Sequence, residues 1–329
     1  MASGLKDKGS YNIADIIGLT PFGEPYTEDD ERNELQKIYD SVKQIHIPVW
    51  EDVVGGRVVF LPGSGARAQK ISELFSHREV HGAERGIVAY TGTIDDIPVL
   101  TMASGMGSGQ TEIIGLELMR AMRHKGGAII RYGSVGALKP VPTVRVGDLL
   151  LAKWAFCADS SFAWMTDEQI ASGNRVELDV GTIMYLEAAL HDAGYLWQTL
   201  NPEAALRYHE GGTQSKALLY AQEMCLGPRG RNFARLKRAY EAFPELDGTE
   251  METALLYTIG NRLIYLVNKF ESRTPFFVGS LNFFIGDSDN SFHPESAVRE
   301  KAEQNLINTV PYVARHMYPA VKAIPPREF

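Results

Sequence analysis

The chain has 329 residues, of which 44% are hydrophobic and 22% are charged, and its formal net charge is −8. This length and composition are typical of a soluble globular protein with a sizeable core, in one large domain or two ordinary ones. The acidic balance argues against a nucleic-acid-binding protein, because the sequence has no basic stripe that would neutralise phosphates.

The first predicted element is a helix within a polar, acidic extension, residues 1–50. The segment YTEDDERNELQKIYDSV places Leu35, Ile38 and Val42 on one face of that helix. We expect the extension to pack on a core formed by residues 51–329.

Short β-branched runs then alternate with helical segments up to about residue 155. RVVFL, GIVAYTG, IPVLTMA, GAIIRYG and GDLLLAKWA are bounded by glycine, proline or charged residues, as buried strands are. ARAQKISELF and GQTEIIGLELMRAMRHKG lie between them and have the apolar spacing of helices. This alternation predicts an α/β sheet covered by helices.

The following part of the chain is more polar, and we expect insertions at about 156–180 and 205–245. METALLYTIGNRLIYLVNKF then predicts a long apolar helix, and PFFVGSLNFFIG predicts another buried strand. Because the sequence has no repeat, low-complexity tract or proline-rich linker, we expect a single domain.

The cellular compartment is predicted from the cysteines and from the absence of apolar segments. Cys157 and Cys225 are far apart and lack CxxC spacing, which favours two reduced thiols. The sequence MASGLKDKGSYN has no apolar signal region, and no apolar run approaches the ~18 residues of a membrane-spanning helix. We therefore expect a cytoplasmic protein without a membrane partner.

Three glycine-rich turns follow predicted strands: LPGSGAR at 61–67, SGMGSGQ at 104–110 and RYGSVGA at 131–137. A single turn of this kind is often only a tight strand-to-helix connection. Three such turns in one sheet, two of them with an arginine, favour a site for a small anion, because ligands gather at the carboxyl ends of parallel strands.

These turns are not known nucleotide or nucleophile motifs. No GK[ST] follows any of them, and Gln110 replaces the third glycine of a dinucleotide fingerprint. Tyr132 and Pro62 stand two residues before Ser134 and Ser64, where a serine nucleophile requires glycine. The histidines have no metal-ligand spacing, so we expect neither a catalytic metal nor a serine hydrolase.

A fourth motif, Glu250-Met251-Glu252-Thr253, begins the predicted long helix. Two carboxylates at a helix start can simply complement the helix dipole. Alternatively, one carboxylate accepts hydrogen bonds from the hydroxyls of a sugar, for which an ionised group is well suited. The residues alone leave both interpretations open.

Taken in order, these motifs resemble the nucleoside phosphorylase family. PGSGAR, Arg85, SGMGSG and RYGSVG followed by VRVGD match the family intervals almost without gaps, and EMET corresponds to its EME motif. The resemblance implies a single-domain, three-layer α/β/α phosphorylase fold with a central mixed, partly barrel-like sheet. It also implies a pentosyltransferase that reversibly converts a nucleoside to free base and ribose 1-phosphate, with inorganic phosphate as co-substrate and no cofactor.

The resemblance further implies roles for individual residues. Those that would bind phosphate are Gly63, Arg67, Arg85, Arg131 and Ser134, with Arg85 reaching across a subunit interface. Those that would bind the ribose are Glu252, Met251, Glu250 and His46, with His46 acting in the neighbouring subunit's site. The candidates for the base are Gly136, Gln222, Tyr220, Arg229, Arg231 and Asn282. The Gln-x-Arg pair of uridine enzymes is incomplete, because Met224 falls where arginine would stand.

Several functions stay open at this point. Phosphorolysis of uridine in nucleoside salvage is favoured, with a purine nucleoside as the main alternative substrate. A hydrolytic nucleosidase fits less well, because three arginines suit phosphate rather than water. An inactive ligand-binding or storage relative is the alternative of another class. We expect a homodimer with shared sites rather than a hexamer, since the polar insertion and acidic extension would block further assembly.

Overall fold

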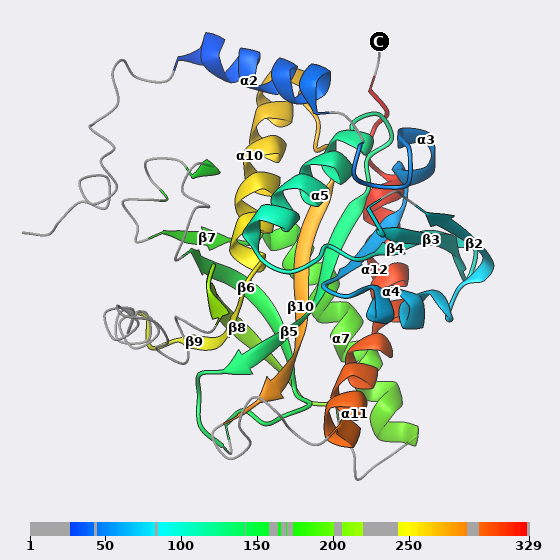
Figure 1. Ribbon diagram of the computed structural model, residues 1–329, viewed down its shortest axis with the longest axis vertical. Coiled ribbons are helices and arrows are strands. Elements are labelled where there is room, and N and C mark those ends of the chain that lie inside the picture. The colour runs from blue at the N-terminus through cyan, green and yellow to red at the C-terminus, as the bar shows by residue number, and fades with distance from the viewer. Residues whose placement is uncertain are drawn as a thin grey trace, which may run out of the picture.

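The computed structural model describes residues 27–42, 45–82, 85–141, 143–157, 164–165, 169, 174–200, 206–219, 243–287 and 296–327 (Figure 1). Five of the strands in these ranges form a closed ring. In order around the ring they are β5 (Ala128–Ala137), β10 (Phe277–Gly286), β6 (Leu149–Cys157), β8 (Tyr208–Ser215) and β9 (Leu246–Glu250), which pairs back with β5. The predicted barrel-like part of the sheet is therefore confirmed.

The rest of the sheet extends outward from β5. The strands in this extension are β1 (Val58–Pro62), β4 (Ile97–Met102), β3 (Val88–Ile94) and β2 (Ser76–Gly82), and the short strand β7 (Arg175–Glu177) is added to β6. β1 runs parallel to both β4 and β5, whereas β3 is antiparallel to β4. The sheet is thus mixed, as predicted. All five residues of β1 are buried, which is usual for a parallel strand covered on both faces.

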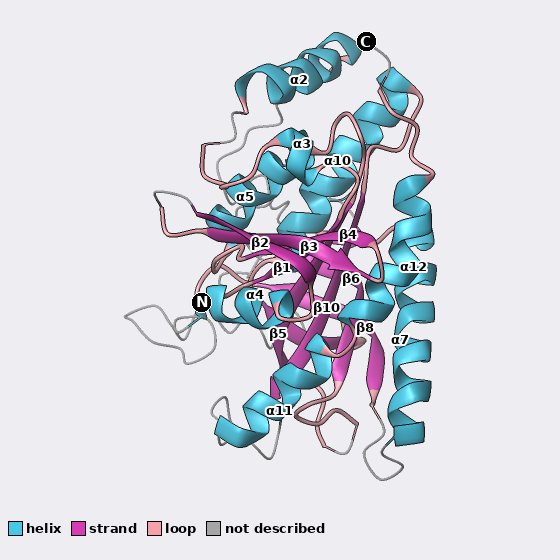
Figure 2. Ribbon diagram, turned by 90° about the vertical axis from the view of Figure 1, so that its right-hand side faces the viewer, coloured by secondary structure: helices cyan, strands magenta, loops and turns pink. Residues whose placement is uncertain are grey.

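Helices cover both faces of this sheet, which gives the predicted three layers (Figure 2). α10 (Thr253–Glu271) packs with α5 (Ser108–Ala121) on one side, and α7 (Val180–Leu200) packs with α12 (Val310–Lys322) on the other. The remaining helices of the core are α4 (Gly65–Ser72), α3 (Glu51–Val54) and α11 (Ser296–Ile307). In the described ranges no helix combines the length and apolar character needed to cross a membrane.

The helix of the amino-terminal extension, α2 (Glu28–Ser41), lies over α10 (Figure 1). Thr27 and Asp30 form a capping box at its start. Leu35 and Tyr39 are buried against Leu266 and Val267 of α10. Ion pairs from α10 also reach α2, with Arg262 Nη2 2.7 Å from Glu34 Oε2. Apolar burial and charge together hold this helix on the core.

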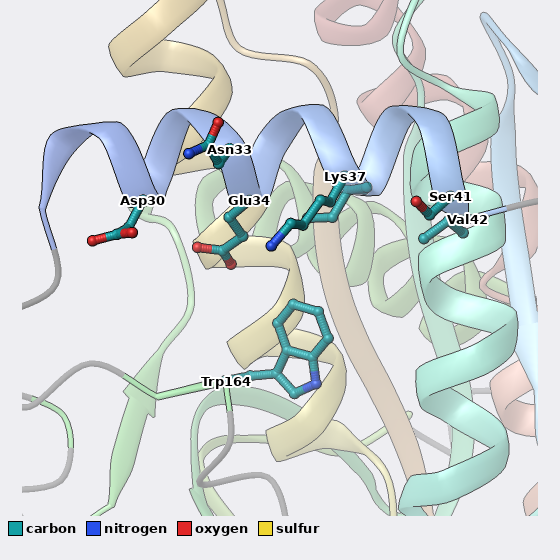
Figure 3. Close-up of a pocket in the computed structure, with 8 residues that line it drawn as sticks. Asp30, Asn33, Glu34, Lys37, Ser41, Val42 and Trp164 are labelled. Carbon is teal, nitrogen blue, oxygen red and sulfur yellow. The ribbon is translucent and has the colours of Figure 1, made fainter. Parts of the chain in front are cut away.

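A cavity of about 460 Å³ lies beneath α2 (Figure 3). Trp164 faces α2 across it, and the Trp164 indole N–H donates to Glu112 Oε1 on α5 at 2.7 Å. The residues that line the cavity are Asp30, Asn33, Glu34, Lys37, Ile38, Ser41, Val42 and Trp164. None of them was predicted to bind phosphate, ribose or base.

The polar region between β6 and α10 contains strands of the core that could not be predicted from its composition. β8 begins at Tyr208, inside the range 205–245 that the sequence assigns to an insertion, and it is an interior strand of the ring. Its sequence, YHEGGTQS, has none of the β-branched runs that reveal the other strands. Much of both expected insertions, including 158–163 and 220–242, lies outside the described residues.

Candidate active site

The first two glycine-rich turns follow β1 and β4 and lie next to each other. The third predicted turn, RYGSVGA, is wrong: residues 131–137 are the second half of the strand β5, because β10 pairs with β5 as far as Gly136. The Ser104 N–H, just after β4, donates to the Pro62 carbonyl of β1 at 2.8 Å. Gly107 has φ 84° and immediately precedes α5, and its N–H donates to Glu252 Oε1 at 2.6 Å. The left-handed backbone of Gly107 favours glycine. The second turn therefore contacts both the first turn and the EMET motif.

Arg131 lies at the centre of this cluster and is only 4% exposed. Its Nη2 donates to Glu252 Oε2 and lies 3.3 Å from Glu250 Oε2, while Nη1 donates to Asn282 Oδ1 at 3.3 Å. Burial acts to lower the pKa of Arg131, but the two nearby carboxylates outweigh burial and raise this pKa above its ordinary value. The guanidinium thus stays charged in the core.

Gly133 is required by the position of this guanidinium. A Cβ built on Gly133 would overlap Arg131 Nη1 and Asn282 Oδ1. The parallel register of β5 and β10 places Gly133 directly beside Asn282. Gly133, within β5, therefore makes room for the Arg131 side chain to fold back over its own strand.

The two glutamates of EMET have different roles in the fold. Glu250 Oε2 accepts hydrogen bonds from the N–H groups of Glu252 and Thr253 at 2.8 and 2.9 Å, at the start of α10. Its other oxygen accepts from the Ser215 hydroxyl. Glu252, by contrast, contacts Arg131 and Gly107. The carboxylate of Glu250 thus stabilises the start of α10, as the first interpretation expects. The binding of a sugar by Glu252 stays a prediction.

Arg67 reaches the same region from the start of α4. Its Nη1 donates to the Tyr132 carbonyl at 3.0 Å, and its Nε donates to Glu303 Oε1 of α11 at 2.6 Å. Burial is the main cause that lowers the pKa of Arg67, and the positive charge of Arg131 acts in the same direction. Arg67 and Arg131 therefore lie close enough to influence each other, and each is paired with a carboxylate.

The other candidates from the turns lie at the same end of the sheet. Ser134 is half-buried and pairs with Phe283, and Gly136 pairs with Thr249 of β9. A Cβ at Gly63 would lie 3.5 Å from the Gly105 carbonyl, and one at Gly107 would lie 3.9 Å from Met251 Cε. Gly63 and Met251 thus border the second turn.

Two predicted residues lie apart from this cluster. Arg85 is exposed in the turn before β3, at the outer part of the sheet. His46 Nδ1 lies 2.6 Å from Glu117 Oε1, and the N–H groups of His46 and Ile47 also donate to that buried carboxylate of α5. Within one subunit neither residue joins the group around Arg131.

The base candidates are only partly described. Gln222, Tyr220, Arg229 and Arg231 lie outside the described residues. Asn282 is fully buried, and its amide accepts from Arg131 and donates to Ser280 Oγ at 2.9 Å. The amide of Asn282 therefore already has protein partners at both ends.

Lys216, which the sequence analysis missed, borders the same cluster. It follows β8 and is 1% exposed, and its Nζ donates to Thr249 Oγ1 at 3.0 Å. No motif marks this residue, because SKALLY matches neither a glycine turn nor a catalytic pattern. Only the pairing of β8 with β9 reveals that Lys216 is next to Glu250.

Metal binding is the last property of the site that the sequence addressed. Among the residues that the structure describes, no three His, Cys, Asp or Glu side chains are grouped so that they could hold a metal ion. The expectation of a metal-free enzyme stays a prediction.

A family model described as the phosphorylase superfamily matches residues 57–264, and the chain belongs to this family. A uridine phosphorylase of Treponema pallidum is 28% identical over 69% of this chain and 80% of its own length. A uridine phosphorylase of Thermococcus kodakarensis is 30% identical over 62% of this chain and 68% of its own length. A DeoD-type purine nucleoside phosphorylase of Lacticaseibacillus casei is also 30% identical, over 61% of this chain and 73% of its length. The relatives are thus nucleoside phosphorylases of both kinds.

Solved structures show the same fold. A structure from a study of two uridine phosphorylases of the oomycete Phytophthora capsici matches with a TM-score of 0.65 at 20% identity, covering 82% of this chain and 95% of that one. A uridine phosphorylase of Vibrio fischeri matches with a TM-score of 0.60 at 20% identity, covering 84% and 99% of the two chains.

Proposed function

We propose that this member of the nucleoside phosphorylase family catalyses the phosphorolysis of uridine to uracil and ribose 1-phosphate. The observation that carries the proposal is the buried contact between Arg131 and Glu252 beside Arg67. The two arginines are cations that can bind an anionic nucleophile, and the Glu252 carboxylate can accept hydrogen bonds from the two hydroxyls of a sugar. An inactive storage protein would have no need of this costly arrangement of buried charges.

In the proposed reaction phosphate attacks C1′ of the nucleoside. A bond forms between a phosphate oxygen and C1′, the bond from C1′ to the base nitrogen breaks, and the base leaves with the bonding electrons. The sugar passes through an oxocarbenium-like state, as in glycoside hydrolysis. Arg67, Arg131, Ser134 and the Gly63 N–H would orient phosphate, and Glu252 with Met251 would hold the ribose. Catalysis then rests on positioning and preorganised charge.

Arg131 and Glu252 must exchange partners for this reaction to occur. In the structure, Arg131 donates to Glu252. In the proposed complex, Arg131 donates some of its hydrogen bonds to phosphate. Glu252 accepts hydrogen bonds from the ribose hydroxyls. The ion pair therefore holds both side chains in the site.

Uridine is preferred over a purine nucleoside for two reasons. The relatives named as uridine phosphorylases align over a large part of this chain, and the structural neighbours carry the same name. In addition, both ends of the Asn282 amide are engaged with Arg131 and Ser280, which disfavours a direct contact of this amide with a purine. A purine nucleoside phosphorylase is similar to this chain at about the same identity, so a purine nucleoside is the second candidate substrate.

The substrate is tested by incubating the purified protein with uridine, thymidine, inosine and adenosine, each with and without phosphate. We expect uracil and ribose 1-phosphate from uridine only when phosphate is present. Chromatography identifies the released base. Rapid cleavage without phosphate would instead indicate a nucleosidase, and hypoxanthine or adenine as the main product would indicate the purine enzyme.

We further propose that the active unit is a homodimer with shared sites. Arg85 is exposed in the turn before β3 and does not join the Arg131 cluster of its own chain. Three exposed apolar side chains lie close in sequence to the candidate residues. Met106 is in the second turn, Ile113 follows that turn, and Ile45 precedes His46. An isologous interface would let each subunit lend Arg85 and His46 to the other.

Subunit complementation tests this arrangement. Arg85→Ala and Glu252→Gln subunits should each be inactive alone, and mixed dimers should regain one intact site, so activity should approach about one quarter of the wild-type value if exchange is random. Subunit exchange is verified with two affinity tags, and self-mixing of each variant is the control. Demonstrated exchange with no recovered activity would exclude shared sites.

A further inference from the structure

Glu117 of α5 is a buried carboxylate that the proposed reaction does not use. Its side chain is 4% exposed. The consecutive backbone N–H groups of His46 and Ile47 both donate to Glu117 Oε2, each at 3.0 Å. Residues 45–50 belong to no helix or strand that would satisfy these N–H groups, so the carboxylate takes over that task. Glu117 thus fixes the segment that carries His46 against α5.

The same carboxylate also contacts the His46 ring. His46 Nδ1 lies 2.6 Å from Glu117 Oε1, and 26% of the His46 side chain is exposed. A neutral imidazole carries a hydrogen on only one of its nitrogens, and an ionised carboxylate can accept a hydrogen bond but not donate one. Contact with Glu117 therefore favours the hydrogen on Nδ1. Nε2, on the other side of the ring, is then left as an acceptor.

The length of α5 separates His46 from the site of its own chain. Gly107, just before α5, donates its N–H to Glu252. Glu117 follows ten residues later, which places it about 15 Å further along the helix axis at ~1.5 Å per residue. A sugar held by Glu252 would therefore lie beyond the reach of a His46 ring that is held by Glu117. This separation favours a role for His46 in a neighbouring subunit's site.

We propose that Glu117 is a positioning residue that holds the neutral His46 ring with its hydrogen on Nδ1, so that Nε2 accepts a hydrogen bond from a sugar hydroxyl of the nucleoside in the neighbouring subunit's site. A hydroxyl suits this nitrogen because it can donate. Glu117 acts through His46 and need not touch a substrate. The ligand of Nε2 rests on the proposed function and on shared sites, whereas the position of the ring hydrogen depends on neither.

Glu117→Gln is expected to move the ring hydrogen of His46 with little change in shape. The amide oxygen should occupy the place of Oε2, because there it accepts from two backbone N–H groups. The amide NH2 then faces Nδ1 as a donor, so Nδ1 must accept and the ring hydrogen moves to Nε2. Glu112→Gln is the matched control, since Glu112 lies on the same helix but its Oε1 accepts from the Trp164 indole N–H at 2.7 Å.

Nitrogen NMR of protein with isotope-labelled histidine rings measures the position of this hydrogen, because protonated and unprotonated ring nitrogens differ in chemical shift. The signals of His46 are identified among those of the eight histidines by their loss in His46→Ala. The spectra are recorded at about pH 8, where an ordinary imidazole is neutral. We expect the hydrogen on Nδ1 in the wild type and in Glu112→Gln, and on Nε2 in Glu117→Gln.

Kinetics test the link to the substrate. Glu252 is proposed to hold the two ring hydroxyls of the ribose, which leaves the hydroxyl on C5′ for His46. Glu117→Gln should therefore lower kcat/KM for uridine about fivefold and leave kcat/KM for 5′-deoxyuridine unchanged. In a His46→Ala background, Glu117→Gln should cause no further loss. An equal loss for both nucleosides, or a further loss without His46, would assign Glu117 to packing and reject the positioning role.

The two measurements separate this inference from the proposed function. If the wild type cleaves no nucleoside, the proposed function and the sugar as ligand of Nε2 are overturned, and the spectra still decide whether Glu117 fixes the ring. If a purine nucleoside is cleaved instead of uridine, that nucleoside and its 5′-deoxy analogue are compared. If Glu117→Gln does not fold, the wild-type spectrum decides. A wild-type His46 ring with hydrogen on Nε2, on both nitrogens or exchanging between them would overturn the inference.

Discussion

Arg131→Ala is expected to lower the free energy of unfolding by about 3–5 kcal/mol, because it leaves two buried carboxylates without their guanidinium. Glu250 and Glu252 both contact Arg131 in the folded protein. Phosphate-dependent cleavage should fall at least about a hundredfold, since the proposed charge-assisted contacts to phosphate are lost as well. Urea unfolding measures the loss of stability, and steady-state kinetics measure the loss of cleavage.

Arg131→Lys separates stability from catalysis. A lysine retains a positive charge near the carboxylates but loses the planar fork that contacts several acceptors at once. We expect this variant to regain much of the stability and little of the activity. If folded Arg131→Lys protein keeps wild-type phosphate kinetics, Arg131 does not bind phosphate.

Gly133→Ala is expected to displace the Arg131 side chain. The added Cβ would overlap Arg131 Nη1 and Asn282 Oδ1, so the guanidinium, the amide or the strand must move. Overpacking of this kind costs about 1–3 kcal/mol of stability, and a misplaced guanidinium should reduce cleavage by at least about tenfold. Thermal unfolding and phosphate kinetics measure these losses.

Gly194→Ala is the matched control for that substitution. Gly194 lies within α7, and a Cβ built there meets no atom within 4 Å. Alanine favours helix more than glycine does, so stability should be unchanged or slightly higher and activity should be unaffected. Equal kinetics for Gly133→Ala and wild type would show that β5 tolerates a side chain at this position and that the position of Arg131 does not depend on Gly133.

The outer strands and the helices near the site were predictable because their patterns are local. VVFLP and IPVLTM are apolar runs, and the helix after Gly107 has regular apolar spacing. Parallel pairing of β1 with β5 then places the end of β1 beside Arg131, which is why Arg67 and Arg131 could be assigned to one site.

The rest of the site depends on pairings between distant segments. β8 is polar and ends at Ser215, whose hydroxyl donates to Glu250, and this polarity hides the strand from a hydrophobic pattern. Glu250 and Glu252 are identical in type, and only the folded geometry separates a helix cap from a partner of Arg131. His46 could be recognised from the sequence as a candidate site residue. Its contact with Glu117 could not be predicted, because the two residues lie in distant segments and no sequence pattern connects them.

The closed ring of strands has a consequence for the order of folding. β10 is the last strand of the ring along the chain, and it inserts between β5 and β6. Contacts between segments that are far apart in sequence form slowly, so this insertion is expected to be a late step. Asn282 and the surroundings of Arg131 are completed by the same step. A ligand that binds at Arg131 would therefore favour the fully closed ring over any partly folded form and would slow its opening.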